Sequence, residues 1–229
     1  MTEVVLVVGA HPDDEILGCG GTIARHVRAG DAVHVAIMGE GIMSRYAPGD
    51  GAPHDDERSR LGACARRAGD ILGITSINFH SFPDNRMDGL DQLDVNRAVE
   101  GIVAGIRPTI VYTHHPFDLN VDHRCIHEGV LTACRPLPGA SVRRILCFET
   151  PSSTEWQTAL PQTAFVPNYY VDISDTLDAK IAALGEYASE MRPFPHPRSL
   201  EGVTHLARWR GACVSCAAAE AFTVARILI

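Results

Sequence analysis

Lysine is almost absent from this chain: Lys180 is the only one, and arginine supplies nearly all of the positive charge. Acidic residues outnumber basic ones, and the formal net charge of −8 argues against a surface for nucleic acid or other polyanions. No apolar run approaches the roughly 18 residues that a membrane-spanning helix needs. The N-terminus carries Glu3 where a secretory signal carries basic residues. We therefore expect no signal peptide, no membrane span and a cytoplasmic protein.

Two common functional motifs are also missing. The glycines of 18–21 come too late and are too closely spaced for the GxGxxG of a dinucleotide site, so they favour close helix–strand packing. The seven cysteines include a single CxxC pair, Cys213 and Cys216, and no second pair completes a zinc cage. Without an export signal we expect reduced thiols. The pair falls in an Ala-rich stretch predicted to be helical, which favours packing over a redox role.

What is present predicts an α/β fold. The 229 residues are 45% apolar, and we interpret residues 1–229 as a single domain. Residues 3–9 form a nearly continuous apolar run, typical of a strand buried on both faces. Alternating strands and helices predict a Rossmann-like, mostly parallel sheet with helices on both faces. The other predicted strands are 31–38, about 74–79, 109–114, 143–149, 169–173 and 222–228; the predicted helices are 15–29, 54–72, 94–106, about 123–134, 174 or 175 to about 190, and 199–219, with a Gly/Pro loop at 39–53.

Chemistry-bearing side chains follow two of these strands. The first loop reads Ala-His-Pro-Asp-Asp-Glu at 10–15, and the loop after 109–114 carries His114, Asp118, Asp122 and His123. Ligands of such sheets bind beyond the carboxyl ends of the strands, so both clusters are expected at one sheet edge. A helix N-cap accounts for one aspartate of the first loop, but not for a second aspartate beside a histidine. A His, an Asp and another His suit zinc and leave a position for water.

These residues resemble the PIG-L or LmbE-like family of zinc-dependent N-deacetylases, which act mostly on N-acetylglucosaminyl compounds. The resemblance rests on AHPDDE at 10–15, on DxNxDHR at 118–124 and on PDNRMD at 83–88. It implies that His11, Asp14 and His123 hold Zn²⁺. It also implies that Asp13 is the general base, which takes a proton from the attacking water and can return it to the leaving amine.

The chain departs from this family at one position. Many members have His where this sequence has Asn120, whose amide can donate a hydrogen bond to an oxyanion but cannot deliver a proton. Either Asp13 performs both proton transfers, or another histidine supplies the acid. The candidates are His114, His115 and His196. Asp122 is expected to orient one of these imidazoles.

Several further residues are candidates for substrate binding, each with a simpler structural alternative. Arg58 resembles a substrate-contacting position but also suits a solvated helix face. Asp84, Asn85 and Arg86 can bind sugar hydroxyls or build a β-turn. Arg198 can pair with an anionic tail or with a surface acid. His196 lies beside it, Trp156 can stack on a sugar, and Trp209 is expected in the core.

The favoured function is removal of the N-acetyl group from an N-acetylglucosamine-type amino sugar or its conjugate. The alternatives are an amidase for a larger N-acyl or thiol conjugate and, less favoured, a nucleotide-binding Rossmann module without hydrolysis. The absence of a membrane anchor favours a soluble small-molecule substrate. A homo-oligomer is compatible with the sequence, which does not show the oligomeric state.

Overall fold

The computed structural model describes residues 2–43, 46 and 55–229. The predicted loop at 39–53 and the predicted helix start at 54 therefore lie largely outside the described residues. The helices are α1 (Asp14–Arg28), α2 (Asp55–Leu72), α3 (Gln92–Ile106), α4 (Val121–Ala133), α5 (Leu177–Gly185) and α6 (Leu200–Ala212), with short 3-10 turns η2 (Met87–Gly89) and η3 (Thr154–Trp156). The strands are β1 (Val4–Gly9), β2 (Ala32–Gly39), β3 (Ser76–Phe82), β4 (Ile110–His114), β5 (Arg144–Phe148), β6 (Tyr169–Asp172) and β7 (Ala219–Ile227).

One sheet contains these seven strands in the order β3-β2-β1-β4-β5-β7-β6. The first five strands of that order are parallel, and β7 runs antiparallel to both β5 and β6. The predicted fold class is confirmed. The strand order reverses between β1 and β4, which pair directly. Their two following loops therefore lie side by side at the carboxyl edge, where open α/β sheets bind ligands.

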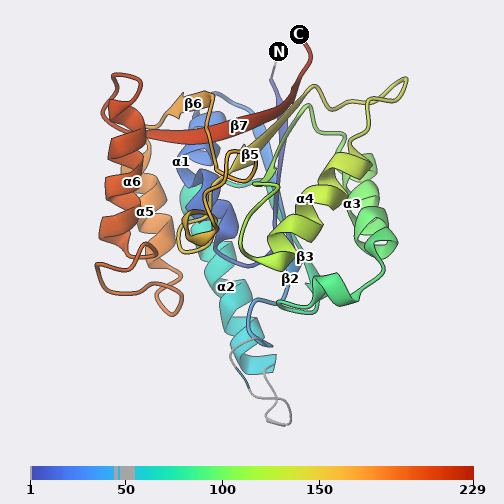
Figure 1. The fold of residues 1–229 in the computed structure, drawn as a ribbon, viewed down its shortest axis with the longest axis horizontal. Helices are drawn as coiled ribbons and strands as arrows, with labels where there is room; N and C mark the ends of the chain where they lie inside the picture. The colour runs from blue at the N-terminus through green and yellow to red at the C-terminus, as the bar shows by residue number, and fades with distance from the viewer. Residues whose placement is uncertain (1, 44–45, 47–54) are drawn as a thin grey trace.

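Helices cover both faces of the sheet, and the two termini lie at the opposite end from α2 (Figure 1). On one face, α1, α2 and α5 pack together over a core that includes Val7, Ile16 and Tyr187. On the other face, α3 and α4 pack over a second core. The β1 side chains are shared between the cores, so the strand is apolar on both sides, as the sequence predicts. Among the described residues, no helix has both the length and the apolar character needed to cross a membrane.

The glycines of α1 confirm the packing interpretation. A Cβ at Gly18 would lie 2.3 Å from Cδ2 of Phe148 in β5, and a Cβ at Gly21 would lie 2.7 Å from Cδ1 of Ile173. Any side chain at these positions would push α1 away from its neighbours. Between them the helix is broken, because Cys19 has φ −150° and ψ 26°.

Two expectations near the C-terminus are wrong. The last helix ends at Ala212, and β7 already begins at Ala219. Cys213 caps α6 and Ser215 has a positive φ of 62°, so the CxxC pair lies in a turn. The alanines favour a helix by propensity, but pairing of β7 with two strands outweighs that preference. Trp209, expected in the core, is 65% exposed on α6.

Smaller differences concern element ends. The third strand continues to Phe82, so His80 lies within β3 and does not begin the following loop. The helix predicted to run to about residue 190 ends at Gly185. The segment between α5 and α6 is irregular, as its prolines predict. It lies against the carboxyl edge of the sheet, where its residues Glu190, Arg192 and Arg198 line a cleft.

Candidate metal centre and active site

The loop after β1 turns sharply into helix α1. Asp13 is the N-cap residue and has φ 109°, a left-handed conformation that is costly for a residue with a side chain. The Asp13 carbonyl accepts the N–H groups of the first helical turn. The His11 N–H donates to Oδ2 of Asp14 at 2.8 Å. This turn places His11 and both aspartates at the helix start, where its dipole favours negative charge.

The second loop is held by its own side chains. Asn120 is the N-cap of α4, and its Oδ1 accepts the N–H of Asp122 at 2.9 Å. Asp118 accepts the N–H of Asn120 and the hydroxyls of Ser153 and Thr154. The first turn of α4 thus carries His123 to the sheet edge beside the first loop.

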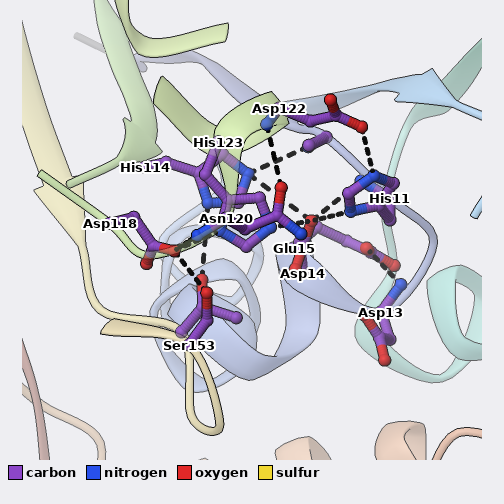
Figure 2. Close-up of polar contacts among 12 residues, drawn as sticks. His11, Asp13, Asp14, Glu15, His114, Asp118, Asn120, Asp122, His123 and Ser153 are labelled. Carbon is purple, nitrogen blue, oxygen red and sulfur yellow. Dashed lines mark hydrogen bonds and ion pairs between the residues drawn. The ribbon is translucent and has the colours of Figure 1, made fainter. Parts of the chain in front are cut away.

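His11, Asp14 and His123 converge, and Figure 2 shows their polar ends pointing toward one another. Oδ2 of Asp14 lies 3.5 Å from Nδ1 of His11 and 3.3 Å from Nε2 of His123. One potential ligand atom from each residue falls within 4.8 Å of the others. A cleft of about 240 Å³ opens beside them. Two imidazole nitrogens and one carboxylate fit zinc with a fourth position open to the cleft.

Further carboxylates hold the far nitrogen of each imidazole. Nε2 of His11 lies 2.9 Å from Asp122 and 3.2 Å from Asp84, and Nδ1 of His123 lies 3.0 Å from Asp118. These contacts fix the ring orientation and leave Nδ1 of His11 and Nε2 of His123 facing Asp14. Asp122 therefore orients His11, whereas the sequence analysis expected it to orient a candidate general acid.

The same contacts govern protonation. Burial lowers the pKa of His123, but Asp14 and Asp118 outweigh burial and raise it to about 9. Burial likewise lowers the pKa of His11, yet its hydrogen bonds with carboxylates leave that pKa well above the usual value. Burial raises the pKa of Asp14, but His123 leads the stronger opposing effects, and the pKa ends well below its ordinary range. The cluster is rich in negative charge and attracts positive charge.

His11, Asp84 and Asp122 form a second group within ligand distance of one another. The Asp122 carboxylate already accepts the N–H of Asn85 at 2.6 Å and that of Met87 at 2.9 Å. Binding a second cation there would require His11 to use both ring nitrogens as acceptors. This group is therefore a hydrogen-bonded support for His11.

Asp13 is 2% exposed and lines the cleft beside Asp14. Oδ2 of Asp13 lies 3.1 Å from Nη1 of Arg198. The Asp13 N–H donates to Oε2 of Glu15 at 3.0 Å, and Oε1 of Glu15 accepts the Tyr187 hydroxyl at 2.5 Å. Burial raises the pKa of Asp13 to about 8, although Arg198 acts against it. Burial also raises the pKa of Glu15 to about 7, opposed mainly by Tyr187.

The structure brings some predicted substrate contacts to the cleft and leaves others away from it. Asp84, Asn120 and Arg198 line it. Arg58 does not, and it forms an ion pair with Glu40 at 2.6 Å. Arg86 is exposed outside the cleft, at the start of η2.

The candidate general acids also lie outside the cleft lining. His114 is fully buried, accepts the Ala10 N–H on Nε2 at 2.9 Å and stacks on His123 with ring centroids 3.8 Å apart. Burial, then His123, lowers the pKa of His114 well below its usual value, so a role as proton donor does not fit this geometry. His115 contacts the carbonyl of Thr163.

His196 lies outside the cleft lining and contacts Arg198 and Trp156. Its Nδ1 accepts the Arg198 N–H at 3.1 Å, and its ring meets Trp156 edge-on with centroids 5.6 Å apart. Trp156 is 53% exposed and remains available at the surface beside this ring. His196 thus supports the backbone of Arg198.

Sequence reasoning missed several residues of the site. Asp118 belongs to the DxNxDHR motif, but its contact with His123 depends on the loop geometry. Glu15 closes the AHPDDE motif, and that position was its only signal. Ser152, Glu190 and Arg192 also line the cleft. They come from irregular segments whose placement no local pattern encodes.

Comparison with known proteins agrees with the motifs. The model of the family described as PIG-L, GlcNAc-PI de-N-acetylase, matches residues 6–134, which is more than half of the chain. The uncharacterized deacetylase YaiS of Escherichia coli K12 is 33% identical over 169 residues, covering 69% of this chain and 78% of YaiS. Diacetylchitobiose deacetylase of Thermococcus kodakarensis is 28% identical over 193 residues, covering 81% of this chain and 69% of that protein.

The fold extends beyond deacetylases. GalB, the 4-carboxy-2-hydroxymuconate hydratase of Pseudomonas putida KT2440, aligns with a TM-score of 0.80 at 22% identity, covering 100% of this chain and 98% of GalB. A hydratase on the same fold means that fold alone does not fix the reaction. The sequence match and the motif residues at the sheet edge do fix the family: the chain belongs to the PIG-L family of de-N-acetylases.

Proposed function

We propose that this protein is a zinc-dependent deacetylase that hydrolyses the acetamide of an N-acetylglucosamine-type amino sugar or its conjugate. The observation that carries the proposal is the convergence of His11, Asp14 and His123 beside a cleft that also holds the carboxylate of Asp13. The named relatives are deacetylases, and one acts on diacetylchitobiose. We further propose that it works in the cytoplasm.

Zinc is the metal that we assign to the site. The two histidines and Asp14 offer the nitrogen and oxygen donors that zinc prefers, and three protein ligands leave one position for the reactants. His11, Asp14 and His123 would hold the ion, and the chemistry it would supply is activation of water and polarisation of the acetyl carbonyl. Asp84, Asp118 and Asp122 keep the two imidazoles oriented toward that position.

The proton transfers fall to Asp13. Its carboxylate lines the cleft next to Asp14, where it can accept a proton from a water that enters the cleft. Asp13 accepts the proton of the attacking water and then delivers it to the amine as the C–N bond breaks. No histidine other than His11 and His123 lines the cleft in the described part of the chain, so Asp13 performs both transfers.

Asn120 takes the place of the more common histidine. Its Nδ2 donates to Oδ1 of Asn85 at 2.9 Å, which fixes the amide plane at the cleft wall. The amide carries two N–H groups, and the second can donate to the oxygen that becomes negative in the transition state. The cleft wall is polar, with carboxylates, amides, hydroxyls and guanidinium groups, which suits the hydroxyl groups of a sugar.

The test is a measurement of the carboxylic acid and free amine released from a panel of N-acetylglucosamine, diacetylchitobiose, N-acetylglucosaminides with varied aglycones and matched compounds with longer N-acyl groups. Metal content is determined in the same samples. We expect activity that disappears with a chelator and returns with about one zinc per chain. Turnover only of substrates with longer acyl groups would support the larger-acyl amidase instead. Zinc-loaded protein that hydrolyses no amide of the panel would refute the proposed function.

A further inference from the structure

Arg198 lines the cleft and makes contacts that the proposed reaction does not explain. It lies in the irregular segment between α5 and α6, far in sequence from the motif loops. Its Nη1 donates to Oδ2 of Asp13 at 3.1 Å, and its Nε donates to Oγ of Ser152 at 3.1 Å. The guanidinium thus connects the proposed general base to the loop after β5.

The backbone of Arg198 is fixed as well. Its N–H donates to Nδ1 of His196, and its carbonyl accepts the N–H of Arg192, both at 3.1 Å. Ser199 then caps α6 by accepting the N–H of Gly202. The side chain therefore extends from an anchored segment, and only 23% of it is exposed. An anchored backbone of this kind lets the long arginine side chain hold its guanidinium group in one place.

Asp13 has a corresponding need for support. Its backbone sits at φ 109°, and the carboxylate of Glu15 holds its N–H. These contacts fix the main chain but not the rotation of the carboxylate about its side-chain bonds. A general base must hold its oxygen within hydrogen-bond reach of the water that it deprotonates, and a displacement of about 1 Å can reduce the rate about 100-fold.

We propose that Arg198 is a positioning residue that locks the Asp13 carboxylate in its catalytic orientation, using Ser152 to fix the guanidinium plane. The inference rests on the proposed function, because it assigns Asp13 to proton transfer. The planar fork of arginine can donate to Ser152 and Asp13 together, whereas the single ammonium of lysine has no such fixed plane. The competing assignment is direct binding of an anionic group of the substrate by Arg198.

Kinetics separate these two roles. For Arg198→Ala we expect kcat to fall about 10–100-fold, with KM changed less than about threefold and zinc content unchanged. Arg198→Lys should recover only part of the loss. Free guanidinium at non-denaturing concentration should restore part of the kcat of the alanine variant, because the site is partly open. Arg67→Ala is the matched control: it removes an exposed arginine paired with Glu186, and we expect neither loss nor rescue.

A double variant tests whether Arg198 acts through Asp13. In an Asp13→Asn background there is no carboxylate base to position, so adding Arg198→Ala should lower kcat less than about twofold. Fully additive losses, or a rise in KM with unchanged kcat, would overturn the proposal in favour of substrate binding.

Crystal structures give a readout that does not depend on the reaction. In Arg198→Ala the Asp13 carboxylate should rotate away from its wild-type position while His11, Asp14 and His123 stay in place. An unmoved Asp13 carboxylate in that variant would refute the positioning role even if no substrate were found. Failure of the proposed function would instead appear in the wild type, as absence of amide hydrolysis with Asp13 still held by Arg198.

Discussion

Two clusters of buried charge touch helix α1, one at its start and one at its break. At the break, Nζ of Lys180 donates to the Leu17 carbonyl at 2.8 Å and forms an ion pair with Glu220 at 2.5 Å. Glu220 also accepts the N–H groups of Gly21 and Thr22 at 3.0 and 2.6 Å. Each charge thus caps one of the two helix ends that the break creates. The positive charge of Lys180 and the negative charge of Glu220 therefore balance.

At the start of α1 the charges do not cancel. Oδ2 of Asp14 faces nitrogens of His11, His123 and His114 at 3.3–3.5 Å. Further buried carboxylates contact the far nitrogens of His11 and His123. Several pKa values in this cluster move far from their ordinary range, in both directions. With the proposed function, the difference indicates two uses of buried charge: the saturated pair completes the helix break, whereas the unbalanced group is the proposed cation-binding and reacting site.

The largest expected effect is that of Asp14→Asn. The variant replaces an anionic ligand with a neutral amide, so zinc affinity should fall by more than the roughly 10–100-fold that loss of an outer hydrogen-bond partner costs. Activity should drop to the level of chelator-treated wild type. Asp118→Asn is the matched control, because it alters the support of His123 and leaves the ligands intact. Zinc titrations decide the matter, and full zinc occupancy in Asp14→Asn would show that the site does not use this carboxylate.

The next effect is that of Asp13→Asn, which separates catalysis from metal binding. The variant preserves size and removes the proton acceptor, so zinc should remain while kcat falls by about 10²–10⁴. Burial raises the pKa of Asp13 and Arg198 lowers it, and only the ionised form is a base. The wild-type rate should therefore decline as pH falls through that pKa. The variant should lack this acidic limb. Loss of zinc from Asp13→Asn with retention in Asp14→Asn would reverse the two roles.

For variants of the charged pair at the break in α1 we expect the opposite result, a loss of stability with activity retained. Lys180→Met leaves Glu220 as an unpaired buried charge and should lower the free energy of unfolding by about 3–5 kcal/mol. A double variant, Lys180→Met with Glu220→Gln, removes both charges and keeps an acceptor for the helix N–H groups, so it should recover part of that loss. Urea unfolding measures both. In folded protein, kcat and zinc content should match the wild type; a specific loss of zinc in Lys180→Met would break the distinction between the clusters.

The residues of the site that could be predicted from the sequence are those placed by regular strands and a motif. His11 and Asp14 follow one buried strand, His123 lies in the loop and helix start after another, and adjacent parallel strands bring them to one edge. Strand patterns and a motif are therefore sufficient to predict their meeting. Arg198 and Ser152 reach the cleft from irregular segments, and only tertiary packing places them. The sequence identified Arg198 as a partner for an anionic tail or a surface acid, but it did not indicate Asp13, since that pairing spans 185 positions.

Local sequence propensity gave wrong predictions where strand pairing or side-chain orientation determines the structure. The alanines before Glu220 suggested a helix, yet they lead into β7, which begins at Ala219, and this strand carries the carboxylate that caps the break in α1. His114 carries a reactive side chain at the expected edge, but the Ala10 N–H occupies its Nε2. Neither the sequence position nor the residue type shows which way that ring turns.

Asn120 is both a helix-capping residue and a cleft-lining residue, and its variants have the smallest expected effects. Like Glu220, it caps a helix, because Oδ1 accepts the Asp122 N–H; like Asp13, it lines the cleft, where Nδ2 can donate to a developing oxyanion. Asn120→Ala removes both roles. Asn120→Ser keeps a capping oxygen and shortens the side chain away from the reacting atoms.

These variants resolve the two roles of Asn120. Asn120→Ala should lose about 0.5–2 kcal/mol of stability, whereas Asn120→Ser should unfold nearly like the wild type. If the amide assists the oxyanion, both variants should lose kcat, by up to about 100-fold, with zinc retained. Asn120→His introduces the residue that the family resemblance leads us to expect at this position, but it does not restore the cap. If Asp13 returns the proton, as proposed, the kcat of Asn120→His should change only a few-fold. A large gain would show that proton delivery limits the wild type, and an Asn120→Ala variant with undiminished kcat would leave Asn120 with the structural role alone.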